Sequence, residues 1–310
     1  MNCIFIYNPN SGKSKKKKRI KYIINYLNNI FDFVEVAPTQ YPKHATLLAK
    51  ESCGRFDYLI VSGGDGTFSE IINGIAEQPH SPTIGYIPSG TVNDISRSLN
   101  IPRNYKKALE NIKNNHIFEH DIFKVNENNY GIYFCGTGAF TNSSYATKQK
   151  SKRFWGKLAY FFYGIKQLFT IKDFRIRLID SDGNVTSGKY IMIIIANSRS
   201  VAGFKINKNA CLQDGSADVV LIKRKNSFLN YLTSLFTMAK LFLFGIDKVK
   251  NKKYVTKLNL SEFSVSISKN LNINIDGEKG PEGNFNFKML QKAVKIITPR
   301  SKKGDKNDIC

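Results

Sequence analysis

The stretch DYLIVSGGDGTFSEIING, residues 57–74, decides the fold of the first part of the chain. Its opening apolar run predicts a buried strand at 57–61, and the segment FSEIINGIAEQ after it predicts a helix. The turn between them consists of Gly63, Gly64, Asp65, Gly66 and Thr67. Glycine lets a backbone approach a ligand closely, and a helix N-terminus attracts anions. The stretch therefore predicts a phosphate-binding loop at a strand-to-helix junction, with Thr67 as the helix cap.

Asp65 is the acid within this loop. A carboxylate beside phosphates makes chemical sense mainly where a Mg²⁺ ion or its waters separate the two anions. In the alternative interpretation the segment is an ordinary glycine-rich turn, in which Asp65 accepts local hydrogen bonds. The combination of three glycines, an acid and a threonine at one junction favours ligand binding.

The remainder of the first part continues this alternation. Apolar runs at 2–7 and 83–87 predict two further strands, and apolar residues at helical spacing predict helices at 13–30 and 104–115. Alternation of strands and helices predicts a largely parallel sheet with helices on both faces.

The pattern changes at about residue 121. Short runs rich in β-branched residues follow, and Asp182-Gly183 between two of them is a hairpin signal. Helices predicted at 153–169 and 227–248 interrupt this β-rich part. We therefore predict an α/β domain at 1–125 with a return of the chain at about 290–300, a β-rich domain at 126–289, and a flexible tail at 301–310.

The composition is that of a folded protein with an excess of positive charge. Of the 310 residues, 42% are hydrophobic, and 47 Lys and Arg against 24 Asp and Glu give a formal charge of +23. Such a balance favours anionic partners, namely nucleotides, nucleic acid or an acidic membrane surface. The chain lacks a Cys-x-x-Cys pair, so a zinc site of that kind is not indicated. A first strand at residue 2 with no signal peptide before it predicts a cytoplasmic protein.

A second polar turn, NPNSG at residues 8–12, follows the first predicted strand. Its continuation Ser11-Gly12-Lys13-Ser14 looks like a P-loop, but that motif needs a glycine five residues before Gly12, where Tyr7 stands. On these residues alone, an anion site and a plain turn both stay open. We expect Lys13 to reach a phosphate and the lysines at 15–18 to be solvated.

Five motifs occur in a fixed order: NPNSG at 8–12, GGDGT at 63–67, GTVND at 90–94, Asp214-Gly215 and Asp276-Gly277-Glu278. Together they resemble the diacylglycerol kinase catalytic family, which has relatives among NAD kinases and phosphofructokinases. The likeness covers nearly the whole chain and is closest to soluble bacterial diacylglycerol kinases. It implies an NAD kinase/phosphofructokinase-like α/β domain followed by a mostly-β sandwich domain. The chain departs from the pattern at Lys208, where the family commonly has a proline, and at Gln213, where close relatives have a second acid.

The resemblance implies ATP and Mg²⁺ as cofactors and suggests the residues that hold them. The nucleotide contacts would be Asn8, Pro9, Asn10, Ser11, Gly12, Thr39, Gly63, Gly64, Asp65, Gly66, Thr67, Phe68, Ser69, Thr91 and Asn93. A magnesium-and-water network would involve Asp65, Asp94 and Asp121. A second, structural Mg²⁺ would be held at Asp214 with the backbone carbonyls of Cys211 and Ser216.

The same resemblance implies a carboxylate base that accepts the proton of the lipid hydroxyl. Phosphoryl transfer needs such an oriented carboxylate, together with charge neutralisation on the phosphates. Asp276 and Glu278 both follow the predicted strand at 271–275, and we expect both at a turn edge rather than in a core. The sequence does not decide which of them is the base.

The implied function is that of an ATP-dependent lipid kinase that converts diacylglycerol to phosphatidic acid at the membrane surface. Another lipid alcohol, such as phosphatidylglycerol or a sphingoid base, stays open, because the motifs concern ATP rather than acyl chains. The further alternatives are an NAD kinase and a basic protein that binds nucleic acid or membranes. The sequence has no recognised nucleic-acid-binding motif, so we expect no nucleic acid partner. A homodimer stays open.

Two segments bear on membrane contact. The segment 148–169 combines basic residues with Trp155 and other aromatic residues, which suits the lipid headgroup region, although a core helix is equally supported. The apolar stretch at 228–246 has Lys240 in its interior and polar residues recurring on one side. This pattern predicts an amphipathic helix rather than a membrane span. We therefore expect a peripheral protein on the inner face of the membrane.

Overall fold

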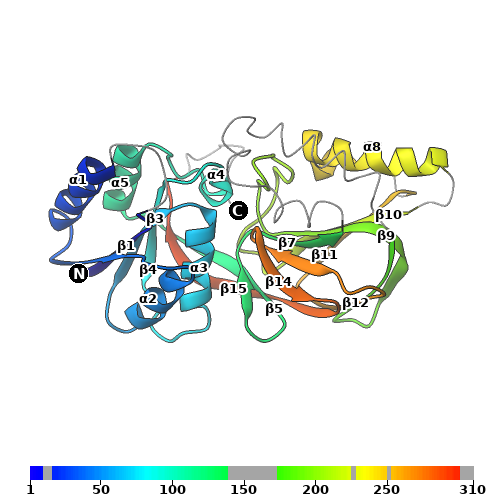
Figure 1. The fold of residues 1–310 in the computed structure, drawn as a ribbon, viewed down its shortest axis with the longest axis horizontal. Coiled ribbons are helices and arrows are strands. Elements are labelled where there is room, and N and C mark those ends of the chain that lie inside the picture. Colours follow the sequence, from blue (N-terminus) through cyan, green and yellow to red (C-terminus); the bar gives the residue numbers. More distant parts are fainter. Residues whose placement is uncertain (10–15, 139–172, 225–227, 250–252, 301–310) are drawn as a thin grey trace. The chain divides into compact units, whose positions relative to one another are not determined.

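The structure is a computed structural model and describes residues 1–9, 16–138, 173–224, 228–249 and 253–300. The chain forms two compact units, each described by itself below (Figure 1). The first unit comprises Met1–Ile122, Cys211–Asp214 and Leu290–Cys310, and the second comprises Phe123–Ala210 and Gly215–Met289. The predictions on Asn10, Ser11, Gly12, Lys13, the helix at 153–169 and the tail at 301–310 fall outside the described residues.

The first unit is built on a parallel sheet with the strand order β2-β1-β3-β4. Its strands are β1 (Asn2–Tyr7), β2 (Phe33–Pro38), β3 (Tyr58–Gly63) and β4 (Thr83–Pro88). The end of β15 (Phe285–Ile297) extends the sheet through the pair Ile296 and Ile84. β3 and β4 are buried along their whole length, as expected for central strands covered on both faces.

Helices cover both faces of this sheet, with α1 and α5 on one side and α2 and α3 on the other (Figure 1). The helices are α1 (Lys16–Asn28), α2 (His44–Ser52), α3 (Asp65–Ile75), α4 (Asp94–Ser98) and α5 (Tyr105–Asn114). Ile23 of α1 and Leu109 of α5 share one apolar cluster with Phe5 and Ile60 of the sheet. The predicted parallel sheet with helices on both faces is therefore confirmed.

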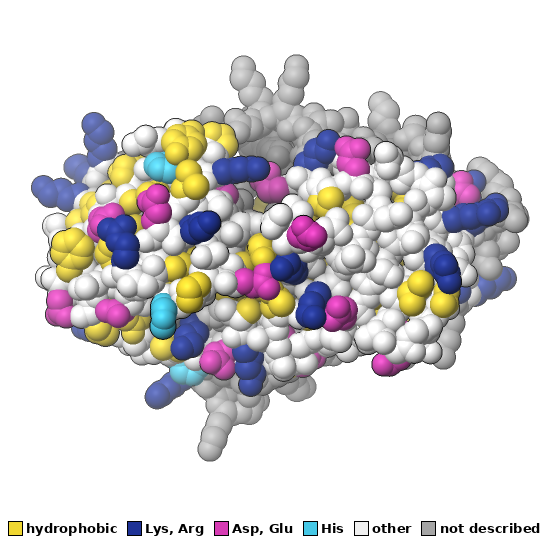
Figure 2. All heavy atoms as spheres, turned by 90° about the horizontal axis from the view of Figure 1, so that it is seen from below, with side chains coloured by type: hydrophobic (Ala, Val, Ile, Leu, Met, Phe, Trp, Pro, Cys, Tyr) yellow, Lys and Arg dark blue, Asp and Glu magenta, His cyan; other side chains and the backbone are white. Residues whose placement is uncertain are grey.

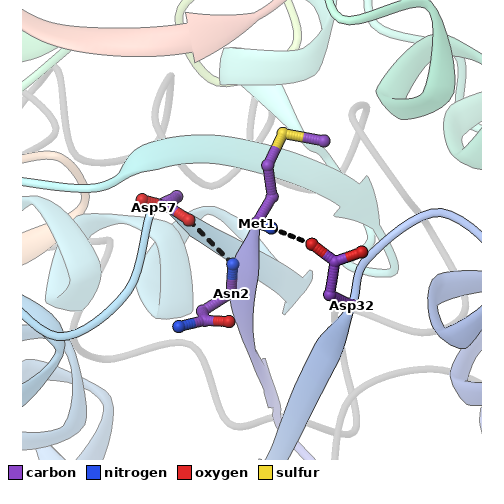
Figure 3. A network of polar contacts seen from close by, with 4 residues as sticks. All are labelled: Met1, Asn2, Asp32 and Asp57. Carbon is purple, nitrogen blue, oxygen red and sulfur yellow. Dashed lines mark hydrogen bonds and ion pairs between the residues drawn. The ribbon is translucent and has the colours of Figure 1, made fainter.

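The start of β1 is held by two carboxylates from neighbouring segments (Figure 3). The Asn2 N–H donates to Asp57 at 2.7 Å, just before β3. The Met1 amine contacts the carboxylate of Asp32, just before β2. These bonds fix β1 between the strands that flank it.

The second unit is a mostly antiparallel β-sandwich. Its strands are β6 (Asn129–Gly131), β7 (Phe134–Gly138), β8 (Phe174–Asp180), β9 (Val185–Ala196), β10 (Ala217–Lys223), β11 (Val255–Leu260), β12 (Glu262–Ile267), β13 (Asn272–Ile275) and β14 (Glu278–Glu282). β5 (Ile117–Val125) and β15 have residues in both units. β8 and β9 form the hairpin predicted at Asp182-Gly183. The predicted mostly-β second part is confirmed.

Strand β9 has both of its faces buried from Tyr190 to its end at Ala196. Ile193 and Ile195 belong to the cluster between the β-strands, which also contains Phe174 and Phe287. The alternate residue Ile194 belongs to a second cluster, which includes side chains of helix α8 (Phe228–Phe244). Alternation along the strand thus divides one continuous apolar run between two cores.

Helix α8 is present as the sequence predicts, and the short 3₁₀ helix Ile246–Lys248 follows it. Ser234 and Thr237 face inward and are buried, whereas Phe236 is 73% exposed. The polar side of the amphipathic pattern is therefore not the exposed side. No described helix combines the length and the hydrophobicity that a membrane-spanning helix needs.

Charged side chains of both signs share the face drawn in Figure 2. Lys and Arg are interspersed there with Asp and Glu, and hydrophobic side chains form small groups. The formal charge of +23 is therefore not expressed as a single-sign field on this face.

Candidate functional site

The glycine-rich loop connects β3 directly to α3. The helix begins at Asp65, and its N-cap residue Gly64 makes no side-chain cap bond. Thr67 lies inside the first helical turn, so its predicted role as the cap is wrong. A Cβ atom on Gly63 would lie only 2.5 Å from the Cβ of Thr67. Glycine at position 63 is therefore required by the packing of Thr67 over the loop.

A second loop, after β4, packs against the first. A Cβ atom on Gly90 would lie 2.6 Å from the Cα of Gly64, and Ser89 N–H donates to the Gly63 carbonyl at 2.8 Å. The two loops follow neighbouring parallel strands, so they meet at the carboxyl edge of the sheet, where open α/β sheets bind their ligands. Gly64 was predicted to let the backbone approach a ligand closely. In the structure its lack of a side chain allows close contact with the backbone at Gly90.

Asn93 and Tyr86 hold this pair of loops in shape. Asn93 is buried, has a φ of 54°, and donates from Nδ2 to the Gly90 carbonyl at 2.9 Å. The hydroxyl of Tyr86 lies 3.3 Å from the carbonyl oxygen of Gly63 and 3.5 Å from Asn93 Oδ1. Sequence reasoning missed Tyr86, although it is the one hydroxyl-bearing ring in the apolar strand TIGYIP.

Two arginines, also missed, bond the second loop from outside. Arg97 Nε donates to the Val92 carbonyl at 3.0 Å, and an Arg103 guanidinium nitrogen donates to the Thr91 carbonyl at 3.1 Å. Both residues follow the GTVND segment closely in sequence, which is the signal that could have identified them. They rigidify the loop that carries Thr91, whose side chain is exposed.

Asp65 and Asp94 form a carboxylate pair at this edge of the sheet. Burial and, secondly, the charge of Asp94 raise the pKa of Asp65 to about 6, against backbone hydrogen bonds at Asn93, Asp94 and Ile95 that lower it. The Ile95 N–H lies 3.3 Å from Asp65 Oδ1. Asp94 itself is only 2% exposed. Two acids held this close in a largely buried setting are suited to a cation.

Asp121 does not join this pair as a third ligand. It is fully buried and accepts the Lys292 N–H at 2.6 Å, while its own N–H donates to the Leu212 carbonyl at 2.9 Å. Within the described residues, no three His, Cys, Asp or Glu side chains converge as a metal site would require. The structure thus brings together two of the three acids assigned to the magnesium-and-water network.

The other predicted nucleotide contacts of the first unit differ in exposure. Asn8, at the end of β1, donates its N–H to the Ser62 carbonyl at 3.0 Å, and Pro9 after it is exposed. Thr39, at the end of β2, is half-buried and bonds the Tyr7 carbonyl at 2.9 Å. Two further predicted contacts, Phe68 and Ser69, are buried, and the Phe68 ring packs on Tyr86 with centroids 4.8 Å apart. Phe68 therefore serves the core.

Asp276 and Glu278 lie at the hairpin between β13 and β14, and the structure separates their roles. Asp276 is 2% exposed, and its carboxylate accepts three successive N–H groups, from Ile132 at 2.8 Å and from Tyr133 and Phe134 at 3.0 Å each. The expectation that both acids lie at an exposed turn edge is therefore wrong for Asp276. Its backbone has a φ of 51°, followed by 89° at Gly277, as a tight hairpin turn requires.

Glu278 is the exposed acid of this hairpin. It is the first residue of β14 and pairs with Ile275. Of the two acids, Glu278 is therefore the one with an exposed side chain, and the carboxylate of Asp276 is engaged in the turn.

The predicted Asp-Gly turn at Asp214 is also present. Asp214 is exposed, and Gly215 has a φ of 75° that favours glycine. Cys211 and Ser216, which were expected to supply carbonyl ligands, are half-buried. A metal ion at this turn stays a prediction.

The chain resembles known proteins over nearly its whole length. Residues 2–125 match the family model of the diacylglycerol kinase catalytic domain, and residues 134–298 match that of the YegS C-terminal NAD kinase beta sandwich-like domain. The chain is 33% identical over 301 residues to a diacylglycerol kinase of Staphylococcus carnosus (strain TM300), covering 96% of this chain and 95% of that protein.

Two further matches point the same way. The chain is 34% identical over 300 residues to a diacylglycerol kinase of Staphylococcus aureus (strain MRSA252), covering 95% of this chain and 91% of that protein. A crystal structure of a diacylglycerol kinase from Bacillus anthracis (strain Sterne) has the same fold, with a TM-score of 0.77, 22% identity and coverage of 96% and 97%. By the catalytic-domain model and by near-full-length identity, the chain belongs to the diacylglycerol kinase family.

Proposed function

We propose that this chain is an ATP-dependent lipid kinase that transfers the γ-phosphoryl group to the hydroxyl of diacylglycerol and forms phosphatidic acid. Membership of a kinase family supports phosphoryl transfer and ATP use. The relatives named diacylglycerol kinase favour that lipid over other alcohols. The single observation that carries the proposal is the pair of interlocked loops with the Asp65 and Asp94 carboxylates at the carboxyl edge of the parallel sheet.

The phosphates of ATP are proposed to bind along this edge. Asn8, Gly64 and Thr91 follow β1, β3 and β4, three strands whose carboxyl ends lie side by side. The N-terminus of α3 points there as well, and helix N-termini favour phosphate groups. The arginine bonds to the Val92 and Thr91 carbonyls keep the loop in place before ligand binds, which lowers the cost of ordering.

The donor set at this edge fits Mg²⁺. Hard divalent cations prefer carboxylate oxygens, and the pKa of Asp65, raised first by burial and then by the charge of Asp94, supports a cation at this pair. Asp65 and Asp94 would hold the ion, directly or through water. When bound, Mg²⁺ would neutralise charge on the transferring phosphates.

Glu278 is the proposed general base. Its exposed carboxylate would accept the proton of the lipid hydroxyl as the hydroxyl attacks the γ-phosphorus. Asp276 would act as a positioning residue, because its three backbone hydrogen bonds fix the turn from which Glu278 projects. Since the acceptor is a lipid, we propose that the reaction takes place at a membrane surface.

The experiment is a comparison of acceptors under one set of conditions. Each reaction contains the chain, γ-labelled ATP, Mg²⁺ and one acceptor. The acceptors are mixed micelles of diacylglycerol, of phosphatidylglycerol or of sphingosine, and NAD. We expect label in phosphatidic acid, with omission of Mg²⁺ abolishing it. Preferential labelling of phosphatidylglycerol or sphingosine would change the substrate, and labelling of NAD alone would refute the lipid kinase.

A further inference from the structure

Helix α8 carries an apolar surface that the fold does not bury. Phe236, Leu243 and Phe244 are 73%, 53% and 61% exposed. Together with the exposed Lys240 they occupy positions four, seven and eight residues apart, which is one face of a helix. We call these four residues the outer face of α8. An exposed apolar cluster of this kind marks an interaction surface.

The orientation of the helix is fixed by its inward side. Met238 and Leu241 are fully buried in the cluster that also contains Ile222 of β10. The Ser234 hydroxyl donates to the Lys223 carbonyl of the same strand at 3.0 Å. A rotation that buried the outer face would expose the two apolar side chains and break this bond. The packing of α8 on β10 therefore keeps Phe236 and Phe244 on the outward side of the helix.

Positive charge accompanies this face. The sequence of α8 contains no Asp or Glu. Beyond its C-terminal end Lys248 is exposed, and the exposed Lys205 and Lys208 lie close in sequence to Ile206, whose carbonyl accepts the Ile246 N–H at 2.6 Å. Lysines beside the C-terminus of a helix are also favoured by its dipole.

One exposed acid, Asp247, precedes Lys248 in this region. Asp247 accepts a hydrogen bond from Asn209 Nδ2 at 3.0 Å. Aromatic and aliphatic side chains on one helical face, with the exposed Lys240 among them and no acid in the helix, are the composition that binds the interfacial region of an anionic bilayer. A symmetric contact between two copies of the chain would instead bring the lysines of both copies together.

We propose that the outer face of α8 docks on an anionic phospholipid bilayer. Phe236, Leu243 and Phe244 lie at the acyl-chain boundary, and the lysines contact the headgroup phosphates. The inference rests on the proposed function, because a lipid kinase must reach an acceptor that resides in a bilayer. It names the surface that brings the chain there.

The test measures vesicle binding without nucleotide. The full-length variant Phe236→Ser/Leu243→Ser/Phe244→Ser is sedimented with vesicles of phosphatidylglycerol and phosphatidylcholine in equal parts. We expect at least a roughly tenfold loss of apparent affinity, because three interfacial apolar side chains are removed. The matched control is Phe33→Ser/Leu47→Ser, which removes apolar residues that are 55% and 49% exposed in the first unit. The control should bind vesicles as the wild type does.

Thermal unfolding and activity on a dissolved acceptor separate the explanations. The α8 variant should keep the wild-type melting temperature and should phosphorylate a short-chain, monomeric diacylglycerol at the wild-type rate. Unchanged vesicle binding overturns the proposal, and so does a loss that coincides with conversion of a dimer to a monomer. If the wild type phosphorylates no lipid at all, the proposed function fails, while the vesicle measurement still decides the docking surface.

Discussion

Asp65 and Asp276 make an instructive comparison, since each is followed by a glycine next to a buried strand. Asp276 receives three backbone N–H groups within 3.0 Å and is enclosed by its own unit. Asp65 instead faces a second carboxylate, and its pKa is raised to about 6, first by burial and then by Asp94. Both carboxylates accept backbone N–H groups, but only Asp65 of the two has a second buried carboxylate beside it, and we propose that a cation balances that pair. The surroundings of the carboxylate therefore distinguish a structural acid from a candidate site acid, whereas the Asp-Gly sequence, which both share, does not.

The largest effect is expected for Asp65→Asn on catalysis. Asn keeps the size and a hydrogen-bond acceptor but removes the charge that would hold Mg²⁺. We expect a loss of about 10³-fold or more in kcat/KM for lipid phosphorylation, as for removal of a principal electrostatic group. The measurement is the micelle assay with labelled ATP, and Asp182→Asn, at an exposed hairpin turn, serves as the control. Wild-type activity in Asp65→Asn would show that the cation site lies elsewhere.

Glu278→Gln should follow, with a loss of about 10²–10⁴-fold in kcat, because the substitution removes the proposed general base. The side chain is exposed, so the melting temperature should stay within a degree or two of the wild type. The KM for ATP should change little. A variant that retains full kcat would exclude Glu278 as the base.

The third prediction concerns the stability of the fold rather than the rate of catalysis. Asp276→Ala leaves the N–H groups of Ile132, Tyr133 and Phe134 buried without their acceptor, which we expect to cost about 2–4 kcal/mol of unfolding free energy. Urea unfolding measures this loss. Equal stability of Asp276→Ala and the wild type would contradict a structural role for Asp276, and the contrast with Asp65 would then be wrong.

The smallest expected effect concerns pH. Burial and the charge of Asp94 raise the folded-state pKa of Asp65 from the usual 3.8 to about 6, so its contribution to stability is present below pH 4 and is lost as pH rises through 6. Without ligands, Asp65→Asn should therefore match the wild type near pH 4 and exceed it by on the order of 2 kcal/mol above pH 7. Urea midpoints between pH 4 and pH 8 provide the measurement. A pH-independent difference between the two proteins would show that the charge of Asp65 is not destabilising.

Much of the fold follows from the sequence alone. Uninterrupted apolar runs at β1, β3 and β4 and helical spacing in α1 and α5 are local signals, and the structure places each element within a few residues of its predicted bounds. The hairpin at Asp182-Gly183 was equally evident, because its turn chemistry is local.

The remaining features depend on contacts between distant segments. Thr67 is of a residue type that often caps helices. The helix nevertheless starts at Asp65, because Gly64 already adopts the extended N-cap conformation. The burial of Asp276 depends on N–H groups more than 140 residues away in sequence, which no local pattern reveals. The same limit applies to α8, where packing on β10 rather than the polar pattern decides which side faces outward.

The pairing of Ile296 with Ile84 has a consequence for the order of folding during synthesis. The last strand of the first unit's sheet is made some 200 residues after its neighbour, and the Thr298 N–H then bonds the His116 carbonyl at 2.9 Å. Some 200 residues are therefore synthesised after β4 before this pair of strands can form. Contacts of such long sequence separation slow folding and leave the edge of β4 uncovered in the meantime.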